Sequence, residues 1–141
     1  MSSSRFVTER DIIYPESDGQ PMAENTLQFT WIVTIQGGLD ALFQDDPNVF
    51  VAGDLFWYPV QGAPHIRMAP DAMVVCGRPK GHRGAYLQWC EADIPPQVVF
   101  EVLSPGNTPA EMRRKFTFYA RYGVEEYYIY DPDRGRLEGF L

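Results

Sequence analysis

The sequence has no apolar run that could cross a bilayer as a helix, which needs about 20 consecutive apolar residues. It has only two cysteines, Cys76 and Cys90, and they lack CxxC spacing. A disulfide scaffold or zinc site is therefore not expected, and both residues are expected to be reduced thiols in the core. The chain begins without a charged flank followed by an apolar segment, so no secretory signal is visible and a cytoplasmic protein is expected.

The chain also lacks the basic excess that sequence-independent duplex binders usually carry. Its formal net charge is −7. Residues 1–77 contain ten acidic and three basic side chains, whereas residues 78–141 contain nine of each. Two basic clusters in the second half could contact phosphates, although such clusters more often form solvated surface: Arg78, Lys80 and Arg83, and then Arg113, Arg114 and Lys115. Charge alone argues mildly against a nucleic-acid partner.

Apolar residues make up 45% of the sequence and aromatic residues 14%, enough for one domain with a packed core over residues 1–141. Residues 1–21 are expected to be an irregular lead-in, because proline and glycine punctuate a polar stretch. Apolar residues then recur at helical spacing from about residue 22 to residue 43. A break is expected at Gly37 and Gly38, since each glycine costs a helix about 1 kcal/mol relative to alanine.

Several stretches rich in β-branched and aromatic residues predict strands. The first two are expected to form an antiparallel hairpin, and residues 98–103 have the apolar character of a central strand. Thr108, Pro109 and Gly123 predict a helix between them. The predicted strands are residues 49–58, 66–76, 85–90, 98–103, 126–130 and 136–140. This order predicts an α/β fold in which helices flank a mixed sheet.

The sequence ends inside its last predicted strand. An unpaired strand edge can pair with another chain, which is why a homodimer is expected. A missing C-terminal segment is the other explanation.

Glu101 is the single charged residue of the predicted central strand. An ionised carboxylate in such apolar surroundings is costly unless it is paired, hydrogen-bonded or bound to a cation. Glu101 therefore marks either a functional site or a structural salt bridge, for example with an arginine of the following helix. Asp71 follows Pro70 at the start of another strand, where a plain turn aspartate is also common. Together the two carboxylates would offer Mg²⁺ or Mn²⁺ the oxygen ligands it prefers.

From about Tyr14 to Leu141 the sequence resembles the family called "putative restriction endonuclease", proteins of unknown function within the PD-(D/E)XK nuclease superfamily. The specific part of the resemblance runs from Glu101 to Pro132. It comprises FEVLSP at residues 100–105, Glu111, Lys115 and Tyr119 on the next helix, and GVEEYYIYDP at residues 123–132. The resemblance implies a restriction-endonuclease-like fold and a metal-dependent endonuclease that hydrolyses phosphodiester bonds of DNA with Mg²⁺ or Mn²⁺.

The resemblance also assigns roles to individual residues. Asp71 corresponds to the motif aspartate and Glu101 to the motif acid, so both are candidate metal ligands and catalytic residues. The superfamily's lysine, two residues after that acid, is replaced here by Leu103. Lys115 on the following helix is the candidate to take its place, where it would orient the attacking water and neutralise phosphate charge.

Further candidates are less specific. Asp54 is expected to be a third metal ligand, with a residue at the hairpin edge as the alternative. Glu24 is either an accessory carboxylate on the first helix or a residue that favours the positive end of the helix dipole. Arg113 and Arg114 are candidates for phosphate contacts, whereas Glu111 is expected to cap its helix.

A catalytically inactive nuclease-fold module with a binding or scaffolding role is the main alternative function. Leu103 at the usual lysine position, the net charge of −7 and the shortened C-terminus favour it. The sequence also leaves RNA open as a substrate in place of DNA.

Overall fold

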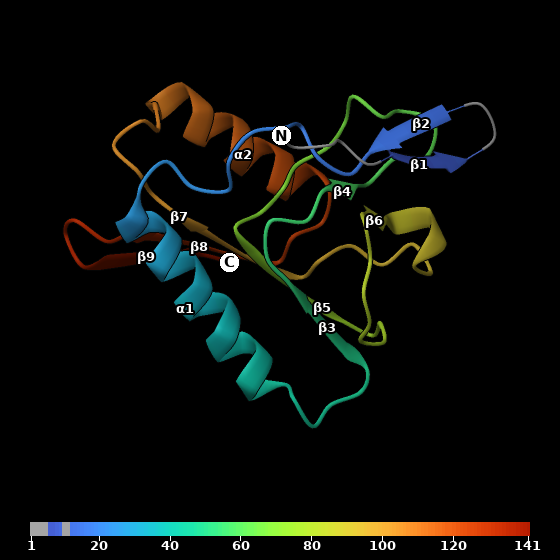
Figure 1. The fold of residues 1–141 in the computed structure, drawn as a ribbon, viewed down its shortest axis with the longest axis horizontal. Helices are drawn as coiled ribbons and strands as arrows, with labels where there is room; N and C mark the ends of the chain where they lie inside the picture. Colours follow the sequence, from blue (N-terminus) through green and yellow to red (C-terminus); the bar gives the residue numbers. More distant parts are fainter. Residues whose placement is uncertain (1–5, 10–11) are drawn as a thin grey trace.

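The structure, a computed structural model, describes residues 6–9 and 12–141. Its centre is a mixed five-stranded sheet in the order β3-β5-β7-β8-β9 (Figure 1). The strands are β3 (Val49–Ala52), β5 (Ala72–Cys76), β7 (Val98–Val102), β8 (Glu126–Asp131) and β9 (Arg136–Phe140). β7 and β8 are parallel, and the other neighbours are antiparallel. The residues expected to form a central strand therefore lie in the middle of the sheet.

Helices α1 (Thr26–Leu42) and α2 (Pro109–Arg121) cover opposite faces of this sheet. Trp31 of α1 contacts the ring of Tyr130, whereas Tyr119 of α2 contacts the ring of Tyr127. Side chains alternate between the two faces of a strand, so Tyr127 and Tyr130 of β8 point to opposite sides. The expected α/β fold with a helix-flanked mixed sheet is confirmed.

The ends of the helices follow local hydrogen bonds. α2 begins as expected, because the Thr108 hydroxyl accepts a hydrogen bond from the Glu111 amide at 3.1 Å. α1 begins later than expected: Asn25 is its N-cap and accepts from the amide of Gln28 at 2.8 Å. Glu24 therefore precedes the helix, and the prediction that it lies on the helix was wrong.

α1 also continues through Gly37 and Gly38, where a break was predicted. Its contacts with β3, β5 and β7 outweigh the intrinsic cost of the two glycines. No helix in the described residues is both long enough and apolar enough to span a membrane.

Several predicted strands are shorter than expected or are divided. Residues 49–58 form β3 and a separate strand β4 (Trp57–Tyr58), and Asp54 between them has a left-handed φ of 48°. Residues 66–76 form a strand only from Ala72. Residues 85–90 form β6 (Tyr86–Leu87), which pairs with β4, and then the 3₁₀ turn η1 (Gln88–Cys90). The predicted antiparallel pairing of the first two strands is confirmed for β3 and β5.

The lead-in is more ordered than predicted. β1 (Phe6–Glu9) and β2 (Ile12–Pro15) form an antiparallel hairpin in place of irregular chain. Residues 1–5 and 10–11 of this stretch lie outside the described residues.

One expectation about side chains fails, and the basic residues 78–83 have partners that the sequence did not show. Cys76 and Cys90 are exposed, so they are not core thiols. Arg78 and Arg83 both bind Glu91, at 3.0 Å and 2.6 Å respectively. Lys80 donates to the carbonyl oxygen of Val49 at 2.7 Å. The basic cluster of residues 78–83 therefore stabilises the fold through internal contacts.

Candidate functional site

Glu101 lies on the sheet face that α2 covers, and its side chain is only 2% exposed. The ammonium of Lys115 donates to Glu101 Oε1 at 3.2 Å, and the hydroxyl of Tyr119 donates to Glu101 Oε2. Residues four apart on a helix share one side, which is why both donors of α2 reach the same carboxylate. The salt bridge considered from the sequence thus exists, but with a lysine in place of an arginine.

Asp71 lies directly before β5, the strand next to β7. Its Oδ2 accepts a hydrogen bond from the backbone amide of Val102 at 2.8 Å, which places its carboxyl group beside that of Glu101. Burial, and then the charge of Glu101, raise the pKa of Asp71 to about 9. Two carboxylates so close and so poorly hydrated are stable together only with a proton or a cation between them.

Lys115 points into this site, and its side chain is only 20% exposed. Burial alone would lower the pKa of its ammonium, but the charges of Glu101 and Asp71 outweigh burial and raise it. Lys115 is therefore a cation at neutral pH. Leu103, at the superfamily's usual lysine position, lies beyond the end of β7 and lines a different pocket with Asn25 and Pro132.

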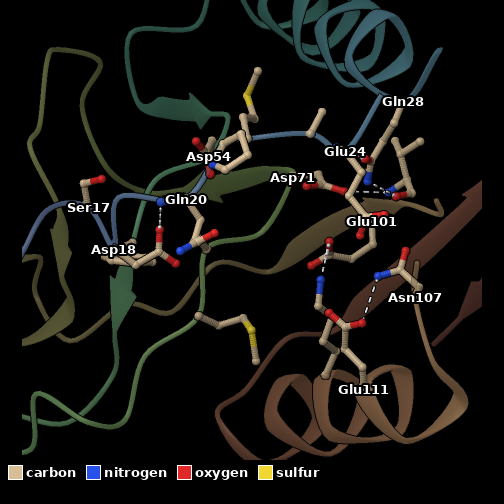
Figure 2. Close-up of a pocket in the computed structure, with 18 of the residues that line it drawn as sticks. Ser17, Asp18, Gln20, Glu24, Gln28, Asp54, Asp71, Glu101, Asn107 and Glu111 are labelled. Atoms are coloured by element: carbon tan, nitrogen blue, oxygen red, sulfur yellow. Dashed lines mark hydrogen bonds and ion pairs between the residues drawn. The ribbon is translucent and has the colours of Figure 1, made fainter. Parts of the chain in front are cut away.

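The two carboxylates lie in a pocket of about 390 Å³. Seven acidic and two basic side chains line it: Glu16, Asp18, Glu24, Asp54, Asp71, Glu101 and Glu111 against Arg67 and Lys115. Figure 2 shows Glu24, Asp71 and Glu101 close together, with Asp18 and Asp54 apart from them. The pocket is therefore strongly acidic, and the ammonium of Lys115 lies beside the buried pair Asp71 and Glu101.

Asp54 lines the pocket but is exposed. Partial burial of its carboxyl group, and then the charges of Asp18 and Glu101, raise its pKa. In the described part of the chain, no group of three or more His, Cys, Asp or Glu side chains is arranged to hold a metal ion. The structure thus brings together Asp71, Glu101 and Lys115, and leaves Asp54 outside this group.

Glu24, which precedes α1, and Gln28, in the first turn of α1, also line the pocket. The carboxylate of Glu24 packs so closely on Gly106 that a Cβ there would lie 2.2 Å from its Oε2. The side-chain amide of Gln28 accepts from the Glu24 amide at 2.8 Å and donates to the Val102 carbonyl at 2.9 Å. Gln28 therefore ties the segment before α1 to the end of β7. Its spacing of four residues from Glu24 was the only signal in the sequence.

Glu111 and the two arginines after it face different surroundings. The carboxylate of Glu111 accepts from the Asn107 amide at 3.1 Å, and this hydrogen bond lowers its pKa. Arg113 and Arg114 are exposed and line a second hollow beside the pocket.

Tyr119→Phe is expected to destabilise the protein by about 1–3 kcal/mol, because it removes a hydrogen bond to a buried carboxylate. Thermal unfolding with and without Mg²⁺ measures the effect. Tyr128→Phe is a matched control, since its hydroxyl bonds Glu126, away from Glu101. Equal losses in the two variants would contradict a particular role of Tyr119 in holding Glu101.

Comparisons with known proteins show the family through one match and the fold through another. Residues 11–141 match the Uma2 family, described as "Putative restriction endonuclease". A crystal structure of "a putative nuclease belonging to DUF820" from Anabaena variabilis ATCC 29413 is similar, with a TM-score of 0.60 and 14% identity. The match covers 94% of this chain and 74% of that one, and at this identity it shows the fold. No curated protein matches the chain. Because the family match spans nearly the whole sequence, the chain belongs to the Uma2 family.

Proposed function

We propose that the chain is a metal-dependent nuclease that hydrolyses phosphodiester bonds of DNA. Asp71 and Glu101 are the proposed ligands of Mg²⁺ or Mn²⁺, and Lys115 is the proposed catalytic lysine. The observation that carries the proposal is the meeting of two carboxylates from neighbouring parts of the sheet with one buried ammonium. The description of the family supports a nuclease, and its restriction-endonuclease label favours DNA over RNA.

The donor set fits a hard divalent cation. It consists of carboxylate oxygens, and Mg²⁺ commonly binds one or two carboxylates and keeps water in its other positions. Burial, and then the charge of Glu101, raise the pKa of Asp71, so two anionic carboxylates are unfavourable here without a cation. A bound cation would relieve this repulsion, polarise a phosphate and lower the pKa of a water molecule.

The acidic lining also explains why a cation would be needed. A phosphodiester is an anion, and seven carboxyl groups against two basic side chains would repel it from this pocket. A cation bound to Asp71 and Glu101 would neutralise their charges, and these two groups would then no longer repel a phosphodiester beside Lys115. Lys115 is then placed to hydrogen-bond a water molecule or a phosphate oxygen.

The remaining contacts hold the site in a fixed geometry. Tyr119 holds one oxygen of Glu101, the Val102 amide holds Asp71, and Gln28 holds the Val102 carbonyl. Such support limits the reorganisation that ligands undergo when a cation or substrate binds.

Plasmid cleavage in Mg²⁺ or Mn²⁺ tests the proposal. Glu101→Ala is expected to cleave at least about 100-fold more slowly, and a chelator should stop cleavage by the wild type. Glu138→Ala is the matched control, since Glu138 is on the exposed strand β9. Cleavage by Glu101→Ala at the wild-type rate would refute the proposed site.

A catalytically inactive binding module is the second candidate. It is favoured by the ion pair that engages Lys115 and by the lack of a third ligand side chain among the described residues. If the wild type binds cations yet cleaves neither DNA nor RNA under broad conditions, this second function replaces the first.

A further inference from the structure

A second hollow adjoins the acidic pocket and has the opposite charge. It has a volume of about 910 Å³ and lies between the segment before β5 and α2. Four arginines line it, together with one histidine and no acidic residue among those described: Arg67, Arg113, Arg114, Arg121 and His65. We call these five residues the arginine groove. Arg67 and Met68 line both hollows, so the groove and the pocket meet at these residues.

The arginines of α2 are available to an outside partner. Arg113, Arg114 and Arg121 are exposed, and in the described part of the chain none has a carboxylate within ion-pair distance. Arg78 and Arg83 differ in this respect, because both form ion pairs with Glu91.

The groove is also extended. Arg114 and Arg121 are seven residues apart, which is about 10 Å along a helix axis. At the other side, the guanidinium of Arg67 lies over the Phe56 ring at 4.7 Å, which fixes its direction near the boundary with the pocket.

We propose that the arginine groove binds the backbone phosphates of the nucleic-acid strand whose scissile bond enters the acidic pocket. This inference rests on the proposed nuclease function and adds the path of the substrate. On a chain with net charge −7, the groove is a local positive surface continuous with the proposed centre. Arginine guanidinium groups bind phosphate oxygens through two parallel hydrogen bonds, which suits a row of phosphates. In this arrangement the nucleic-acid strand runs from the acidic pocket past Arg67 and along α2.

Binding of a fluorescently labelled oligonucleotide, measured by anisotropy in chelator over a series of salt concentrations, tests the groove without cleavage. Arg113→Ala/Arg114→Ala is expected to bind at least about 10-fold more weakly than the wild type. The slope of log K against log salt should become shallower by about 1.8 for duplex DNA, or about 1.4 for single-stranded DNA, because two phosphate contacts are lost. The matched control is Arg134→Ala/Arg136→Ala, which removes the same charge from the exposed β8–β9 hairpin.

The outcomes separate this inference from the proposed function. Equal losses in the two double variants, or no loss in either, would overturn the groove, because only general charge would then matter. Polyglutamate binding that is tighter than DNA binding and that is lost in the groove variant would assign the groove to an acidic protein and also overturn it. Calorimetric Mn²⁺ binding should be unchanged in the groove variant, since neither arginine contacts Asp71 or Glu101. If the wild type does not bind Mn²⁺, the proposed metal-dependent function is refuted, whereas the oligonucleotide result still decides the groove.

Discussion

Asp71→Asn is expected to stabilise the metal-free protein while it removes cation binding and cleavage. Asparagine keeps the hydrogen bond from the Val102 amide, and its NH₂ group can donate to Glu101 at neutral pH, where the native carboxyl group must first take up a proton. Stability should rise by roughly 1–2 kcal/mol, which corresponds to several degrees in the unfolding midpoint. Cleavage should fall by at least about 100-fold, because one of two proposed ligands has lost its charge.

The same variant should change the pH dependence of stability. Asp71 titrates with an ordinary pKa of 3.8 in the unfolded chain and about 9 in the folded one, so the folded state holds this proton more tightly. Raising the pH from about 4 to about 9 therefore destabilises the metal-free wild type. Asp71→Asn should be less sensitive over this window, whereas Asp133→Asn, in an exposed turn, should follow the wild type. A variant less stable than the wild type at pH 8 would show that the two carboxylates do not repel each other.

Lys115→Met is expected to separate cation binding from catalysis. In the metal-free protein it leaves Glu101 without its cationic partner, which should cost about 2–4 kcal/mol of stability. Mg²⁺ should restore most of this loss and should bind at least as tightly as to the wild type, because the competing ammonium is gone. Cleavage should nevertheless fall by about 100-fold or more, since the charge that would contact the phosphate is missing.

The sequence provides a matched control, because Lys80 is its only other lysine. Lys80→Met loses the hydrogen bond to Val49 but does not touch the pocket, so it should cleave normally. Denaturant unfolding with and without Mg²⁺, together with initial cleavage rates, measures both effects. Wild-type cleavage by Lys115→Met would exclude a catalytic role for this lysine.

The burial of Glu101 was predictable because the strongest signals in the sequence are local. The apolar residues around Glu101 identified an internal strand, and the structure places this strand in the middle of the sheet with the glutamate buried. The ends of α2 were predictable for the same reason, since Thr108 and Gly123 act on their nearest neighbours. The approach of Lys115 to Glu101 followed only from the family resemblance, because a contact between a helix and a strand has no local pattern.

The errors have a tertiary origin. Residues 49–58 have the composition of one strand, and nothing local shows that Asp54 adopts a left-handed conformation that ends β3 early. This turn leaves Asp54 exposed and apart from the carboxylate pair. The glycines of α1 were predicted to break the helix because propensity ignores the sheet against which it packs. The internal partner of Arg78 and Arg83 could not be predicted, because Glu91 comes later in the chain and meets them only in the folded protein.

The most direct test of the account is calorimetric titration of Mn²⁺ into the wild type and Glu101→Gln at neutral pH. Glutamine keeps the size and the hydrogen-bonding oxygen of the side chain but removes the charge that the proposed cation would neutralise. We expect the wild type to bind Mn²⁺ and Glu101→Gln to bind at least about 10-fold more weakly. Equal affinity in both proteins, or no binding by either, would contradict a cation site between Asp71 and Glu101.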